Sequence, residues 1–183
     1  MFGLSKRERA DREIKEIATW VLGQSMVHGS NFAPVGVFET GRQMTIALEA
    51  CAFFLHAVDR LAYRPRDERL RELVYDITAS QMVRTFSDMI FKARAPSSLS
   101  EIEEGNRGLF NTRQREYGNA ARLIGETFND LTSASWLAAH TVGHAAEIPD
   151  RDIRLMALHT ELVNSLVVMD LANRIKKVES YIM

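Results

Sequence analysis

Residues 40–63, TGRQMTIALEACAFFLHAVDRLAY, are mostly apolar, and several of their polar side chains fall on one line. In a helix of about 100° per residue, Glu49, His56 and Arg60 lie within roughly 60° of one another, with Asp59 at the edge of this polar stripe. A helix that is apolar around most of its circumference belongs in the interior of a bundle. We therefore expect the polar stripe to face something specific: a pocket, another helix or a partner chain.

Composition limits the classes of protein that this chain can belong to. Its 183 residues suffice for one domain with a real core. Lys plus Arg number 23 against 24 for Asp plus Glu, a net charge of -1 that favours no nucleic-acid surface. The longest uninterrupted apolar runs, such as residues 50–55, fall far short of the roughly 20 residues that span a bilayer. The single cysteine, Cys51, excludes an intrachain disulfide and is consistent with a reducing compartment. We expect a soluble cytoplasmic protein that binds neither nucleic acid nor membrane.

Helix-start signals occur where the apolar periodicity lapses. The pairs Ser5 with Glu8, Thr40 with Gln43, and Ser98 with Glu101 (or Ser100 with Glu103) each have the spacing of a capping box. Pro149, followed by two aspartates, predicts a further start there, because proline fits the first helical turn and acids favour the positive helix end. No stretch alternates with period two for long enough to predict a strand.

These signals predict an all-α fold, an antiparallel bundle of about five long helices in a single domain over residues 1–183. The longer connecting loops are expected at residues 29–39 and 95–112, the second with a weak short helix around residues 101–107. A continuous helix is expected through the apolar spacing of residues 117–138. The last helix, from residue 149 to about 181, would be some 45 Å long, at about 1.5 Å per residue. Its excess length predicts packing against a second copy, so we expect a homodimer.

Histidines form the sharpest chemical cluster of the sequence. His140 and His144 make an H-x-x-x-H pair, one turn apart on a helix face, and two imidazoles at that spacing can share a divalent transition metal. His56 would supply a third ligand if its helix faces theirs, with Glu49 or Asp170 as a carboxylate. A histidine on an early helix followed by H-x-x-x-H resembles the DinB-like bundles, which bind a divalent metal with three histidines. The resemblance covers these three residues alone.

A structural interpretation of the same residues competes with the metal site. HTVGH lacks the glutamate of zinc proteases after its first histidine, and Gly143 weakens the helix locally. Asp170 lies among apolar residues of the last helix, where an unpaired charge is costly. It is expected to pair with Arg60, with a histidine or with a metal. Glu49, His56, Arg60 and Asp170 would then form a polar network that fixes the register of the helices.

No sequence motif identifies a reaction. The chain has no glycine-rich nucleotide loop and no Gly-x-Ser-x-Gly elbow, so whether it is an enzyme stays open. The favoured hypothesis is a self-associating binding or scaffold module with no open cleft along the polar stripe. The alternative is a metal-dependent enzyme or metal sensor that uses the histidines. A third hypothesis, a bundle that holds an apolar small molecule between its helices, needs a cavity that the sequence does not reveal.

Overall fold

The protein is all-α in the computed structural model, as the sequence predicts. The structure describes residues 4–33, 40–65, 67–94, 98–127 and 130–182, and contains no strand within these ranges. A short π-helix, η1 (Glu72–Asp76), joins the short helix α3 (Arg69–Arg71) to α4 (Ile77–Arg94). The elements are α1 (Lys6–Phe32), α2 (Thr40–Ala62), α3 (Arg69–Arg71), η1 (Glu72–Asp76), α4 (Ile77–Arg94), α5 (Leu99–Gly118), α6 (Ala134–Ala145), α7 (Arg154–Met169) and α8 (Leu171–Ile182).

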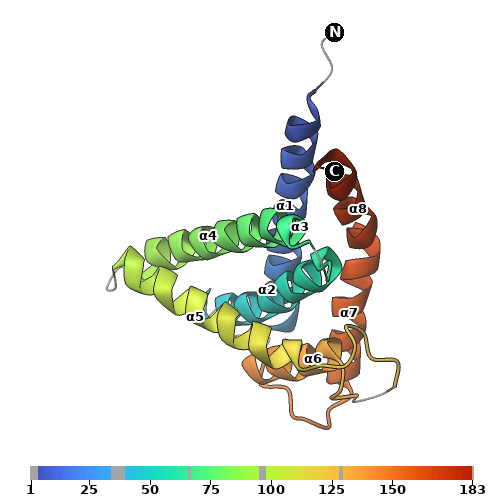
Figure 1. Ribbon diagram of the computed structural model, residues 1–183. Helices are drawn as coiled ribbons and strands as arrows, with labels where there is room; N and C mark the ends of the chain where they lie inside the picture. The colour runs from blue at the N-terminus through green and yellow to red at the C-terminus, as the bar shows by residue number, and fades with distance from the viewer. Residues whose placement is uncertain (1–3, 34–39, 66, 95–97, 128–129, 183) are drawn as a thin grey trace.

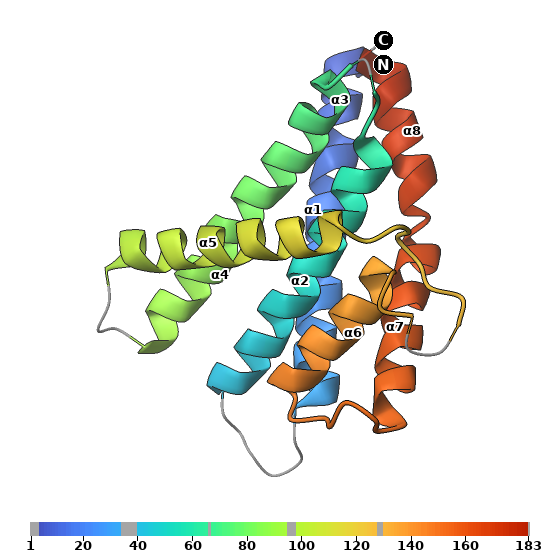
Figure 2. The same cartoon turned by 60° about the horizontal axis from the view of Figure 1, so that its bottom comes forward.

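Helix α2 forms the centre of the fold. It packs against α1, α4, α5, α6 and α8. Figures 1 and 2 show α1 and the α7–α8 pair running along the bundle, while α4 and α5 form a V that projects to one side. Residues 50–58 of α2 are all buried, His56 included, because neighbours surround the helix on nearly every side. The apolar circumference of this helix thus predicted its interior position.

Helices α1 and α2 approach closely at Gly29. A Cβ atom at this position would lie 2.5 Å from the backbone oxygen of Gln43 and 3.0 Å from the Cβ of Ala47. Glycine therefore permits the contact. The loop expected at residues 29–39 begins later than predicted, because α1 continues to Phe32. Residues 34–39 of that loop lie outside the described part of the chain, as does the side chain of Thr40 in its predicted capping box.

The predicted loop at residues 95–112 is wrong, because α5 begins at Leu99. Its start is the predicted capping box: Ser98 accepts from the backbone N–H of Glu101, whose side chain accepts from the Ser98 backbone. The helix buries only a narrow face, which includes Phe110 and Tyr117, so its apolar periodicity is weak.

The continuous helix expected over residues 117–138 is also wrong. Helix α5 ends at Gly118, and the following segment pairs with the chain just before and at the start of α6. The backbone N–H of Ala121 donates to the oxygen of Thr132 at 2.8 Å, and that of Ala134 donates to Arg122 at 2.9 Å. These long-range hydrogen bonds replace those of a helix.

The single long terminal helix is interrupted at Asp170. This residue adopts a left-handed conformation with φ of 53°, which ends α7 before α8 begins. By length and composition, Arg154–Ile182 is the one stretch of the described chain that is apolar enough to cross a membrane, and 39% of its most apolar window is buried. The left-handed residue Asp170 interrupts this stretch.

Candidate metal centre

The structure brings His140 and His144 of α6 together with Asp150 from the connection to α7. One ligand atom from each residue lies within 4.8 Å of the other two. His140 Nδ1 and His144 Nε2 lie 3.2 Å and 2.6 Å from the same carboxylate oxygen, Oδ1 of Asp150. The hydrogen bonds from His144 and His140 hold the pKa of Asp150 below its ordinary value. We call these three residues the His–His–Asp cluster.

A Schellman turn at the end of α6 places Asp150 beside the histidines. The N–H of Ile148 donates to the oxygen of Gly143 at 2.8 Å, and that of Glu147 donates to His144 at 3.1 Å. Glu147 occupies the left-handed position with φ of 58°, where glycine is the usual residue. The turn reverses the chain and returns Asp150 to the histidine face of α6.

Gly143 allows this turn to pack against α7. A Cβ atom at residue 143 would lie 2.4 Å from Cδ2 of Leu155, which is buried in the core. Gly143, which weakens the helix by its low helix propensity, is therefore the residue that lets α7 pack closely against α6. The spacing of the two histidines is kept, because both belong to the regular part of α6.

The cluster offers two imidazole nitrogens and one carboxylate oxygen, a donor set that suits zinc, iron, nickel or copper. Tetrahedral ligand atoms about 2.05 Å from a zinc ion lie about 3.3 Å from each other. The His140–Asp150 separation of 3.2 Å already matches this value, and the His144–Asp150 separation of 2.6 Å must open slightly. His144 and Asp150 are 65% and 64% exposed, so a rotamer change can supply the movement.

His56 does not belong to the His–His–Asp cluster. Its Nδ1 lies 2.9 Å from Oε1 of Gln114 on α5, and its ring packs edge-on against Tyr117. Burial lowers the pKa of His56, so the ring is neutral near pH 7. Asp150 takes the place that the sequence analysis gave to His56 in the ligand set.

Two other residues of the polar stripe, Glu49 and Asp59, pair with arginines of neighbouring helices rather than with one another. Glu49 accepts two hydrogen bonds from the guanidinium of Arg113 on α5, at 2.7 Å and 2.8 Å. Asp59 accepts from Nε of Arg71 at 2.5 Å. Arg60 is exposed and lines an open cleft together with His56 and Asp59. This cleft counts against the expectation that the stripe is closed off from solvent.

Asp170 lies elsewhere and has a local role. Its carboxylate accepts from the side-chain amide of Asn173 at 2.8 Å and 3.0 Å, and the residue is exposed. The expectation of a buried charge paired with Arg60, a histidine or a metal is therefore wrong. The apolar neighbours of Asp170 in the sequence suggested a buried position, but the helix ends at this residue and its side chain is exposed.

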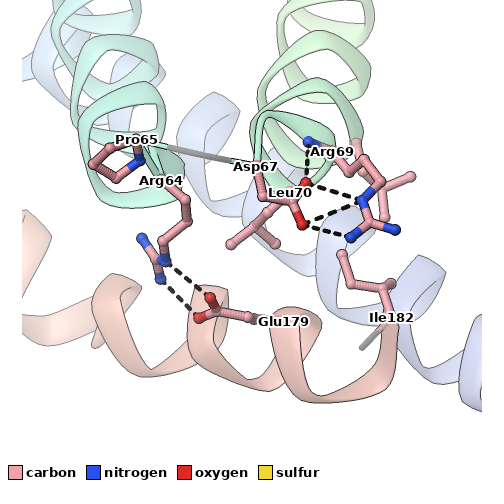
Figure 3. Close-up of a pocket in the computed structure, with 8 residues that line it drawn as sticks. Arg64, Pro65, Asp67, Arg69, Leu70, Glu179 and Ile182 are labelled. Atoms are coloured by element: carbon pink, nitrogen blue, oxygen red, sulfur yellow. Dashed lines mark hydrogen bonds and ion pairs between the residues drawn. The ribbon is translucent and has the colours of Figure 1, made fainter.

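A second hollow, between the α2–α3 connection and α8, has a volume of about 730 Å³ but little free polar chemistry. Figure 3 shows its charges engaged with each other: Arg64 binds both oxygens of Glu179, and Asp67 binds Arg69. Leu70 and Ile182 supply apolar walls. We therefore do not assign it a chemical role.

Comparison with protein-family models, with curated proteins and with solved structures gave no significant match to this chain. The sequence pattern did not predict a site role for Asp150, which was interpreted only as an acidic residue at a helix start. It also did not predict a role for Arg113, because most of its helix was expected to be a loop. The two aspartates after Pro149 were the available signal for the first.

Proposed function

We propose that this chain is a helical-bundle protein that binds a divalent transition metal reversibly through His140, His144 and Asp150. The supporting observation is the convergence of three ligand atoms within 4.8 Å. Three protein ligands leave at least one coordination position for water or another ligand. A metal sensor or buffer fits better than an enzyme, because two of the three ligands, His144 and Asp150, are largely exposed to water, which weakens the electrostatic effects that an enzyme site needs.

Metal titration of protein purified without a histidine tag and stripped with EDTA tests this proposal. We expect one equivalent of Zn²⁺ to bind and to raise the melting temperature, since a ligand of the folded state stabilises it by mass action. His144→Gln and Asp150→Asn should each weaken binding by at least about tenfold, a loss of about 1.4 kcal/mol. Both side chains are exposed, so the fold should tolerate both changes.

Two control variants separate this site from other ligand sets. Asp152→Asn makes the same change two residues away, at a carboxylate that accepts from the backbone N–H of Arg154, the first residue of α7. His56→Gln removes the histidine that the sequence analysis placed in the site. Both should bind Zn²⁺ like the unmodified protein. Less than about 0.1 mole of any transition metal per chain on purification, together with no thermal shift, would refute metal binding.

We also propose that two copies associate through α7. Exposed or half-buried residues follow a heptad along this helix and the residue before it, with alternating three- and four-residue spacing: Ile153, Met156, Thr160, Val163 and Val167. Ile153 and Val167 are 70% and 68% exposed. Such a seam is typical of a helix that pairs with another helix. Thr160 lies midway between these two residues, so an antiparallel pair of copies would set Ile153 of each against Val167 of the other.

Light scattering over micromolar concentrations measures this association, with and without Zn²⁺. We expect a dimer that Val167→Asp converts to a monomer. Phe91→Asp, a matched change at an exposed apolar position on α4, should leave the mass unchanged. A monomeric mass for the unmodified protein at every concentration would refute the α7 interface. The metal titration is independent of that result.

A further inference from the structure

The polar stripe opens into a cleft of about 680 Å³ between α2, η1 and α5. The π-helix forms one wall and the second half of α5 another. A π-turn inside a helix often marks a functional site. Most residues that line the cleft carry a polar group at the end of the side chain, and they include three arginines and two tyrosines. The residues are His56, Asp59, Arg60, Tyr63, Arg71, Tyr75, Asn111, Gln114, Arg115 and Gly118.

The charges of this cleft leave two free cations. Asp59 is bound to Arg71 at 2.5 Å, so that pair is neutral as a unit. Arg60 and Arg115 are exposed and have no carboxylate partner among the residues that the structure describes. His56 is neutral because burial lowers its pKa. The net charge of about +2 complements a phosphomonoester, which carries about -1.5 to -2 at pH 7.

Two buried nitrogens at the same cleft also lack a partner. Nδ1–H of His56 donates to Oε1 of Gln114, which leaves the lone pair of His56 Nε2 and the N–H groups of Gln114 Nε2 unsatisfied within the described chain. His56 is only 1% exposed, so an unmet polar atom there is costly. A single hydroxyl group can donate to the first nitrogen and accept from the second.

We propose that this cleft binds a small phosphomonoester that carries free hydroxyl groups, such as a sugar phosphate. Arg60 and Arg115 bind the phosphate through their guanidinium N–H groups. A hydroxyl of the ligand pairs with His56 and Gln114 deeper in the cleft. Tyr75, whose phenol stays protonated because burial raises its pKa to about 12, offers a further donor on the π-helix wall. Its ring is stacked under the guanidinium of Arg71 at 6.0 Å.

Calorimetric titration with three probes tests the two halves of the ligand separately. Ribose 5-phosphate carries both groups, inorganic phosphate carries only the anion, and ribose carries only hydroxyls. We expect ribose 5-phosphate to bind about tenfold or more tightly than inorganic phosphate, and ribose not to bind measurably. All titrations contain EDTA, so the result does not depend on the metal site.

Variants assign the contacts. The double variant Arg60→Gln, Arg115→Gln should weaken ribose 5-phosphate binding by about tenfold to a hundredfold, whereas Arg84→Gln, at an exposed arginine on α4, should not. His56→Phe should reduce ribose 5-phosphate to the affinity of inorganic phosphate and leave inorganic phosphate unchanged. Circular dichroism checks that each variant is folded. Equal affinity for the two phosphates overturns the hydroxyl contact, and an unchanged affinity in the double arginine variant overturns the phosphate site.

Discussion

The ion pair between Glu49 and Arg113 is the strongest test of how the polar stripe holds the bundle together. The two side chains are only 9% and 22% exposed, and they share two hydrogen bonds across the α2–α5 contact. Removing one partner of a buried pair leaves an uncompensated charge, which costs about 3–5 kcal/mol when burial is complete. Because Arg113 retains some exposure, we expect Arg113→Met to lower the free energy of unfolding by about 2–3 kcal/mol.

The partner variants make this prediction specific. Glu49→Gln keeps an oxygen that accepts from Arg113, and the freed guanidinium still binds Glu116 at 2.6 Å, so its cost should be only about 1 kcal/mol. The double variant Glu49→Leu, Arg113→Met should be about as stable as the unmodified protein, because an apolar pair needs no desolvation of charge.

Urea unfolding followed by circular dichroism gives the free energies for this comparison. The Arg113→Met loss should correspond to about 2–4 °C in melting temperature per kcal/mol for a chain of this size. Two outcomes refute the reasoning. The first is an Arg113→Met variant no less stable than Glu49→Gln. The second is a double variant that loses the sum of the single costs, since additive losses mean that the two side chains do not interact.

Three further predictions concern the backbone and one buried histidine. Gly29→Ala should lower the unfolding free energy by about 1–3 kcal/mol in urea titrations, because the added Cβ meets the backbone of α2. Gly23→Ala, with open space around the same helix, should raise it by up to about 1 kcal/mol. Glu147→Gly should melt no lower than the unmodified protein, since relief of the left-handed strain offsets the lost ion pair with Arg42. Burial lowers the pKa of His28, so the folded state resists protonation while the unfolded state takes up a proton below about pH 6.5. Stability measured by urea unfolding should therefore be complete above that pH and fall on acidification toward pH 5, by up to about 1.4 kcal/mol per pH unit for this residue. His28→Gln should flatten the profile, and an identical profile in both proteins would show that another group controls it.

The fold class followed from the sequence because apolar periodicity and capping residues are local signals. The capping boxes at Ser5 and Ser98 both form as expected. The extent of α5 was missed, since a helix with one narrow buried face has little periodicity to detect. The break at Asp170 was missed for a different reason. An aspartate tolerates the left-handed conformation, and nothing in an apolar run reveals that tertiary packing will require it.

The candidate sites show the same division between local and long-range information. H-x-x-x-H is a local pattern, and α6 keeps its spacing in the structure. The third ligand depends on a turn at Glu147 that combines an unfavourable φ with a close approach of Leu155 to Gly143.

In the cleft at the polar stripe, His56 contacts Gln114 only because α5 crosses α2. The two residues are 58 positions apart in the chain. At both candidate sites the histidines could be identified from the sequence, but the groups that they contact depend on how the helices pack. The structure therefore separates one expected site into two candidates: a metal cluster at the α6–α7 turn and a polar cleft at the far half of α2. Because no residue is shared between them, a His144→Gln variant and an Arg60→Gln, Arg115→Gln variant should each weaken one binding activity and leave the other intact.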